Sequence, residues 1–126
     1  MSAVAGDHRQ SLGILGEELA CAELLRRGYE ILARRYRTRY GEIDIIARHG
    51  AVTVFVEVKA RVRNDFGSGA AAITPWKQRR IAKMAMDFLA RSRLNETPCR
   101  FDVVTVDLAA DTPVVEVYTN AFDSFA

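Results

Sequence analysis

The chain lacks any apolar run that approaches the roughly 20 residues needed to cross a membrane. Its first residues, 1–7, also lack a basic region followed by an apolar core, so they do not resemble a signal peptide. These two absences predict a cytoplasmic protein with no membrane partner.

Cysteine is scarce as well, with only Cys21 and Cys99 in the chain. Neither has a second cysteine or a histidine at the spacing of a zinc site. Because a disulfide is not expected in a reducing compartment, we interpret both as small hydrophobic residues inside the fold.

Of the 126 residues, 49% are apolar and 27% are charged, which is the balance of a soluble globular protein. This length accommodates one domain with a core and is too short for two ordinary domains. No linker or repeat divides the sequence, so we expect a single domain over residues 1–126.

The net charge is only +2, but the charges are unevenly distributed. Residues 1–58 hold eight basic and eight acidic side chains, residues 59–93 hold nine against two, and residues 94–126 hold one against six. The basic excess in residues 59–93 predicts that this segment binds an anion. Arginine outnumbers lysine fifteen to three, which suits bidentate phosphate contacts and equally fits an effect of genomic base composition.

The order of elements predicts an α/β fold without repeats. Helical spacing of apolar residues indicates a helix over residues 10–27, which Gly28 ends. Strands are predicted over residues 29–37, 42–61 as a hairpin, 101–108 and 114–118. Thr74 and Pro75 have the residue types of an N-cap and first helical position, so they begin a second helix.

The hairpin over residues 42–61 carries the pattern that predicts chemistry. Its turn is His49-Gly50, and side chains alternate along a strand, so Glu57 and Lys59 share one face. If the register of the two strands brings Asp44 beside Glu57, these carboxylates can bind one cation. Taken alone, the pattern more often reflects charges on the solvated face of an antiparallel sheet. The acid on the paired strand and the basic segment after Lys59 favour the functional interpretation.

The sequence resembles the YraN family of small bacterial proteins, within the restriction-endonuclease-like, or PD-(D/E)xK, superfamily. The resemblance extends over nearly the whole chain. It rests on Gly16-Glu17, Gly28, residues 41–44, residues 54–59, Phe66-Gly67, Thr74-Pro75 with Lys77-Gln78, residues 99–104 and Asn120-Ala121-Phe122. It implies a restriction-endonuclease-like αβββαβ sandwich, in which a mixed central sheet is flanked by helices. This fold has active and inactive members alike.

The first half of the chain is also similar to archaeal Holliday-junction resolvases, which implies a further site residue, Glu17, on the first helix. Helical spacing does not choose between Glu17 and Glu18, and an exposed helix glutamate is an equal alternative. Two positions are notable. Ile43 stands where the superfamily has its proline, which is usual for this family. Arg35 stands where the family is expected to have an asparagine, so this member is expected to bind substrate differently if that asparagine positions it.

The predicted mechanism uses a hard divalent cation, Mg²⁺ or Mn²⁺, held by Asp44, Glu57 and the main-chain carbonyl of Val58. The cation would activate a water and polarise the phosphorus centre. Lys59 would hold or help to deprotonate the nucleophile and offset developing negative charge. Glu42 is a candidate additional ligand, although a glutamate at a strand end is more often solvated.

Basic residues around this site are predicted to bind the substrate backbone. The substrate-binding candidates are Arg61, Arg63, Lys77, Gln78, Arg80 and Lys83, with Arg79 beside them. For Lys77 a solvent-facing position in the first turn is slightly favoured over a phosphate contact. For Trp76 packing over the sheet is favoured over stacking on a base.

The sequence therefore predicts a metal-dependent endonuclease acting on DNA, with branched or flapped structures as candidate substrates. A non-cleaving nucleic-acid-binding protein of the same fold is the alternative. RNA remains open as a substrate but is favoured less than DNA. A homodimer would suit cleavage of two strands, although the sequence reveals no dimer surface.

Overall fold

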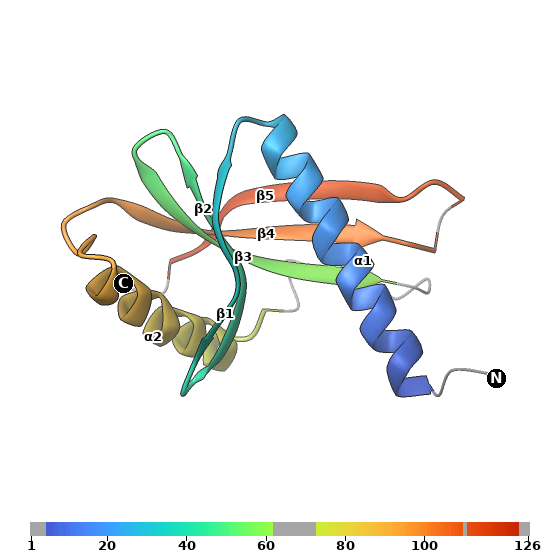
Figure 1. Ribbon diagram of the computed structural model, residues 1–126, viewed down its shortest axis with the longest axis horizontal. Coiled ribbons are helices and arrows are strands. Elements are labelled where there is room, and N and C mark those ends of the chain that lie inside the picture. Colours follow the sequence, from blue (N-terminus) through green and yellow to red (C-terminus); the bar gives the residue numbers. More distant parts are fainter. Residues whose placement is uncertain (1–4, 62–72, 110, 124–126) are drawn as a thin grey trace.

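The computed structural model describes residues 5–61, 73–109 and 111–123. Two helices and five strands follow one another along the chain (Figure 1). They are α1 (Ala5–Arg26), β1 (Glu30–Thr38), β2 (Gly41–His49), β3 (Val52–Arg61), α2 (Pro75–Arg91), β4 (Cys99–Asp107) and β5 (Val114–Phe122). Every predicted element is present within the described residues, while Phe66-Gly67, which contributes to the family resemblance, lies outside them.

The five strands form one sheet in the order β1-β2-β3-β4-β5. Strands β3 and β4 are parallel, and the other neighbouring pairs are antiparallel. The parallel pair requires a crossover, and α2 lies in the connection between β3 and β4. This mixed sheet with two helices confirms the predicted α/β fold and is consistent with a restriction-endonuclease-like sandwich.

The predicted hairpin between β2 and β3 is confirmed. His49 pairs with Val52 across a two-residue turn, and Gly50 occupies the first turn position with a φ of 64°. Glycine adopts this left-handed conformation without the steric cost that other residues meet. The turn thereby sets a register in which Ile45 lies opposite Val56, close to the predicted site.

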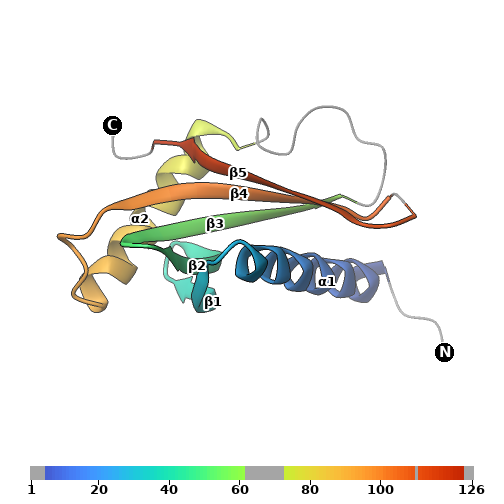
Figure 2. The ribbon, with the colours of Figure 1, turned by 90° about the horizontal axis from the view of Figure 1, so that it is seen from above.

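The two helices cover opposite faces of the sheet, and the alternation of side chains divides the core between them (Figure 2). Val54 and Val56 of β3 pack with Leu24 of α1 in one cluster. Phe55, between them in sequence, packs with Met84 of α2 in the other cluster. Because residues 53, 55, 57 and 59 alternate with the α1-facing valines, Glu57 and Lys59 share a face, as predicted, and this face is the α2 side of the sheet.

Helix α2 begins as its sequence indicates. The Thr74 side chain accepts a hydrogen bond from the Lys77 main-chain nitrogen at 3.2 Å, and Pro75 occupies the first helical position. One apolar side of the helix faces the core: Ile81, Met84, Ala85 and Leu89 are buried, and Phe88 packs against them.

Three smaller predictions have mixed outcomes. Cys21 is buried, Cys99 is half-buried, and both are free thiols. Trp76 does not pack over the sheet, because 61% of its surface is exposed. Its ring instead lies against the Arg80 guanidinium, 4.8 Å from ring centre to Cζ. Neither described helix has the length and apolarity that a membrane-spanning helix requires.

Candidate metal and nucleic-acid site

The carboxylates of Asp44 and Glu57 meet where β2 separates from β3. The described ladder between these strands ends at Ile45 and Val56, and one further step along each strand reaches Asp44 and Glu57. Asp44 Oδ2 accepts a hydrogen bond from the Val58 main-chain nitrogen at 2.8 Å. The predicted meeting of the two acids therefore occurs, and Asp44 supplies the acceptor for a β3 N–H beyond the last ladder pair.

Asp44 is costly to ionise in this position. Its removal from water, followed by the negative charge of Glu57, raises its pKa from 3.8 to about 7. The Val58 N–H opposes this rise, and the charge of Glu17 adds to it. A buried carboxylate beside a second carboxylate is an arrangement that a divalent cation would stabilise by neutralising both.

The carbonyl of Val58 is suitably placed to add a third oxygen. In a strand, the N–H and C=O of one residue project toward the same neighbouring strand. Because the Val58 N–H reaches Asp44, its carbonyl also projects toward the gap beside β2. The described residues contain no cluster of three or more His, Cys, Asp or Glu side chains with metal-site geometry. Two carboxylates and this carbonyl are thus the donor set available.

Lys77 contacts the site directly, contrary to the prediction that it faces solvent. Its Nζ lies 2.5 Å from Glu57 Oε1, and both side chains are largely buried. This ion pair links the first turn of α2 to β3. Lys77 therefore neutralises Glu57 in the structure, whereas the ionised form of Asp44 is disfavoured.

Lys59 shares the α2-side face of β3 with Glu57 and is half-buried. Within the described residues it makes no ion pair with a carboxylate. Its ammonium group therefore remains available to an anionic ligand, which is consistent with the predicted role.

The choice between Glu17 and Glu18 is decided by the packing of α1. Glu17 is half-buried and its charge reaches Asp44, whereas Glu18 is exposed. Glu17 Oε1 lies 3.0 Å from Arg35 Nε. The electrostatic link to Asp44 and the ion pair place Glu17 at the edge of the site, outside the immediate donor set.

Gly16 explains how α1 comes close enough for this contact. A Cβ atom at Gly16 would lie 2.9 Å from the Cβ of Ala60, which is closer than side chains pack. The missing side chain lets the α1 backbone rest on β3 next to Lys59. Gly16 thus positions its neighbour Glu17.

Arg35 adopts a φ of 51°, in the left-handed region that asparagine and glycine tolerate better than arginine. The asparagine expected at this position would therefore suit the backbone. The arginine gains the ion pair with Glu17 in exchange for that conformational cost. No sequence pattern reveals this partnership, because the two residues belong to different elements and the backbone conformation is not visible in the sequence.

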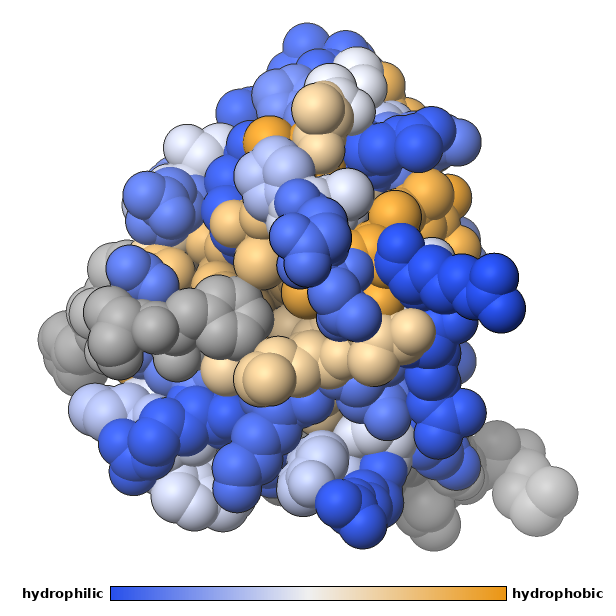
Figure 3. Space-filling model, turned by 90° about the vertical axis from the view of Figure 1, so that its left-hand side faces the viewer, coloured by the Kyte–Doolittle hydropathy of each residue, from blue (hydrophilic) through white to orange (hydrophobic). Residues whose placement is uncertain are grey.

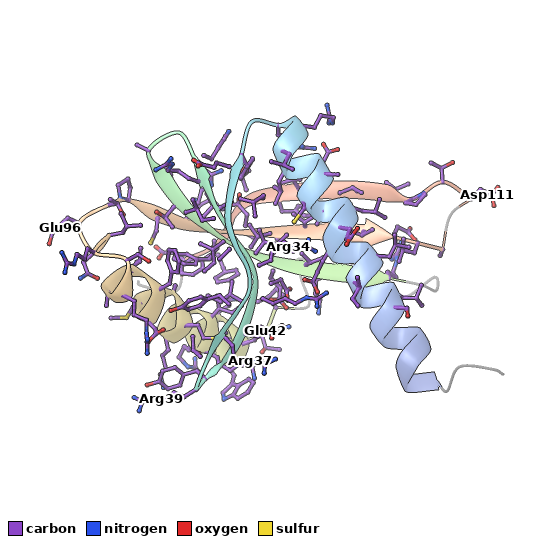
Figure 4. The ribbon with its side chains drawn as sticks, viewed as in Figure 1. Arg34, Arg37, Arg39, Glu42, Glu96 and Asp111 are labelled. Carbon is purple, nitrogen blue, oxygen red and sulfur yellow. The ribbon has the colours of Figure 1, made fainter. Side chains whose placement is uncertain are left out.

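The other predicted candidates are distributed around the site. Glu42 is exposed and pairs with Arg37 at 3.2 Å, so the solvated interpretation of Glu42 is correct; Figure 4 shows both on the β1–β2 hairpin. Arg61 pairs with Asp107 at 2.8 Å, and Arg63 lies outside the described residues. Gln78 donates from Nε2 to the Ile73 carbonyl at 3.0 Å, so it fixes the start of α2.

Arg80 and Lys83 are held by aromatic rings instead of carboxylates. Arg80 lies over Trp76, and the Lys83 Nζ is 5.5 Å from the centre of the Tyr40 ring. The Arg80 Nε is buried without a hydrogen-bond partner in the described part of the chain. Both cations therefore remain able to contact a phosphate.

Comparison with known proteins places this geometry in a family. The model of the uncharacterised protein family UPF0102 matches residues 16–106. A UPF0102 protein of Geobacter metallireducens is 45% identical over 92% of this chain and 95% of its own length. The UPF0102 protein STH1475 of Symbiobacterium thermophilum is 48% identical over 79% of this chain and 85% of its own. The matched residues span Glu17 and the whole of β2 and β3.

Proposed function

The chain belongs to the uncharacterised protein family UPF0102, and we propose that it is a metal-dependent endonuclease that hydrolyses phosphodiester bonds in DNA. Branched or flapped structures are the proposed substrates. The observation that carries the proposal is the contact of Asp44 and Glu57, in which the pKa of Asp44 rises to about 7. A protein gains no stability from two adjoining buried carboxylates, so their contact requires another explanation.

A divalent cation fits this donor set. Asp44, Glu57 and the Val58 carbonyl offer hard oxygen ligands of the kind that Mg²⁺ and Mn²⁺ prefer. When bound, the cation would lower the pKa of a water and polarise the phosphate. It would also offset the charge repulsion that raises the pKa of Asp44.

The surrounding side chains are suited to hold a phosphate and move a proton. Lys59 projects from the face of Glu57 and has no carboxylate partner among the described residues, so it can orient the attacking water and balance negative charge. Glu17 and Arg35, held together at 3.0 Å, border the site from the α1 side. Arg35 takes the place of the expected asparagine as the group that approaches the substrate from β1.

One observation favours the alternative, a nucleic-acid-binding protein that does not cleave. The Lys77 ammonium group lies 2.5 Å from Glu57 and competes with a cation for that carboxylate. In the endonuclease, Lys77 must release Glu57 when metal binds and is then free to contact a phosphate. In the binding protein, this ion pair persists.

The test is a cleavage assay on linear, flapped and four-way DNA with Mg²⁺ or Mn²⁺. We expect Asp44→Asn, Glu57→Gln and Lys59→Ala to lower the cleavage rate by at least about a hundredfold, since each removes a group that acts on the transition state. Binding of the same DNA in a chelating buffer should change far less. Equal cleavage by Asp44→Asn and the unmodified protein would overturn the proposal.

A matched control separates catalysis from general charge. Arg48→Ala removes an exposed cation that pairs with Glu30 at 2.5 Å, and it should leave cleavage unchanged. Lys77→Ala discriminates between the two functions. If the protein is an endonuclease, this variant should bind Mg²⁺ more tightly than the unmodified protein. If neither protein binds the metal, the result supports the non-cleaving alternative.

A further inference from the structure

A groove lies between the end of β1 and the second half of α2. Residues 36–40 form one wall and residues 83–92 form the other, and they enclose about 680 Å³. A pocket of this size accommodates a small organic group, such as one or two nucleotides, and is far too narrow for a duplex. We name it the Tyr40 groove after the ring at its rim.

The Tyr40 groove is strongly cationic. Arg37, Arg39, Lys83 and Arg91 line it together with one acid, Asp87, and Arg37 is paired with Glu42 beside the groove at 3.2 Å. Asp87 is already satisfied, because it accepts hydrogen bonds from the Tyr36 hydroxyl at 2.7 Å and from Arg91 at 3.2 Å. These contacts hold the pKa of Asp87 below its usual value, with the Tyr36 hydrogen bond as the largest cause. The remaining positive charge therefore faces the groove.

Two of these cations flank one aromatic ring. The Arg39 Cζ lies 4.9 Å from the centre of Tyr40, and the Lys83 Nζ lies 5.5 Å from it. Within the described residues neither Arg39 nor Lys83 forms a salt bridge, although the charge of Arg39 also helps to lower the pKa of Asp87. Figure 4 shows Arg39 at the outer end of the hairpin, pointing away from the sheet. An aromatic ring between unpaired cations matches unpaired nucleotides, whose bases stack while their phosphates need positive charge.

The surface continues from the Tyr40 groove toward the carboxylates. Trp76, Arg80 and Lys83 are spaced four and three residues apart, so they form one line along α2. Lys77, next to Trp76, contacts Glu57. Lys77 and Lys83 are six positions apart, which is about 9 Å along the helix axis. Figure 3 shows the side of the molecule that lies on the left in Figure 1, where hydrophilic side chains lie above and below a band of apolar ones.

We propose that the Tyr40 groove binds an unpaired nucleic-acid strand and that the α2 surface leads this strand to the carboxylate site. This inference rests on the proposed function. It identifies the flap or the unpaired arm of a branched substrate as the feature that the protein recognises. Duplex recognition would use phosphate contacts alone and would not require the Tyr40 and Trp76 rings.

The test measures binding by fluorescence anisotropy in a chelating buffer, so that it does not depend on cleavage. The probes are a labelled single-stranded oligonucleotide, a blunt duplex of the same sequence and a duplex with an unpaired arm. We expect Arg39→Ala combined with Lys83→Ala to weaken binding to the two unpaired probes by about tenfold or more. The log-log salt slope on the single strand should fall by about 0.7 for each lost contact.

Two further variants separate stacking from folding. Tyr40→Leu should weaken binding to the unpaired probes by about tenfold. Tyr40→Phe keeps the ring and removes only the hydroxyl that accepts a hydrogen bond from Arg39 at 2.8 Å, so it should retain most of the binding. Thermal unfolding checks that each variant is folded. The matched control combines Arg26→Ala with Arg48→Ala, which removes the same charge far from the groove and should leave the preference for unpaired probes unchanged.

The outcomes are distinct from those of the cleavage assay. If the Arg39 and Lys83 variant loses duplex and single-strand binding equally, the groove is a duplex contact and the proposal is overturned. If it binds every nucleic acid normally, the groove serves another ligand class, such as an acidic peptide, and the proposal is likewise overturned. If unpaired probes bind through the groove although Asp44→Asn cleaves normally, the result supports the proposed groove and overturns the proposed carboxylate chemistry.

Discussion

Two aspartates of the sheet, Asp44 and Asp102, are both largely removed from water, but they differ in how many hydrogen-bond donors surround them. Asp102 is fully buried and has donors on all sides. It accepts hydrogen bonds from the Tyr29 hydroxyl at 2.9 Å, Arg100 Nε at 3.0 Å and the Asn120 main-chain nitrogen at 2.9 Å. Asp44 has one main-chain donor and two acidic neighbours, and its pKa rises to about 7.

This difference shows how burial of a charge indicates its role. Asp102 connects the loop after α1, β4 and β5, and its compensated charge belongs to the architecture. Asp44 is uncompensated, so its position weakens the metal-free protein instead of supporting it. An aspartate that is buried without sufficient donors is therefore the better candidate for a ligand site.

The largest expected effect comes from breaking the Asp102 network. Asp102→Ala should lower the free energy of unfolding by about 3–5 kcal/mol, because Arg100 and the Tyr29 hydroxyl lose their buried acceptor. Urea denaturation provides the measurement. Glu30→Ala, which removes an exposed ion pair with Arg48, should cost less than about 1 kcal/mol. Equal losses for the two variants would mean that the hydrogen bonds of Asp102 do not stabilise the fold more than an exposed ion pair does.

The next effect is a pH dependence that Asp44 alone should produce. Its pKa is 3.8 in the unfolded chain and about 7 in the folded one, so the folded state holds the proton more tightly. The contribution of Asp44 to stability is full below pH 4, decreases as the pH rises toward about 7, and levels off above it. We expect the stability of the metal-free protein relative to Asp44→Asn to fall over this window by an amount on the order of 1–4 kcal/mol.

Thermal or urea unfolding of both proteins in a chelating buffer between pH 4 and pH 8 measures this difference. Subtracting the two curves removes groups that titrate in the opposite sense, such as Asp87, whose pKa is lowered mainly by the Tyr36 hydroxyl. Added Mg²⁺ should restore stability above pH 7 only in the protein that retains Asp44. A flat difference curve would show that the carboxyl is not strained in the fold.

The smallest effect distinguishes two glycines of α1. Gly13→Ala should stabilise the protein by up to about 1 kcal/mol, because alanine favours the helix and the position has no atom within 4 Å. Gly16→Ala should destabilise it by about 1–3 kcal/mol and lower cleavage, since its Cβ would meet Ala60 at 2.9 Å and move Glu17 away from Asp44. Chemical denaturation and the cleavage assay test the pair. Similar behaviour of both variants would separate the α1 contact from the site.

Local sequence patterns were sufficient for most of the fold. Thr74 and Pro75 predict the start of α2 because capping involves only neighbouring residues. Gly50 predicts the β2–β3 turn, and the turn sets the register that brings Asp44 beside Glu57. The prediction that Trp76 packs over the sheet is wrong, because the direction of a side chain at a helix start depends on how the helix packs on the sheet.

The sequence by itself determined the hairpin and, through its two-residue period, the shared face of Glu57 and Lys59. Tertiary structure alone decided which α1 glutamate approaches Asp44, that Lys77 pairs with Glu57, and that Arg39 and Lys83 meet at the Tyr40 ring. The reason is the range of the interactions. Turns, caps and strand alternation depend on residues a few positions apart, whereas these contacts arise only after two helices have packed onto opposite faces of the sheet.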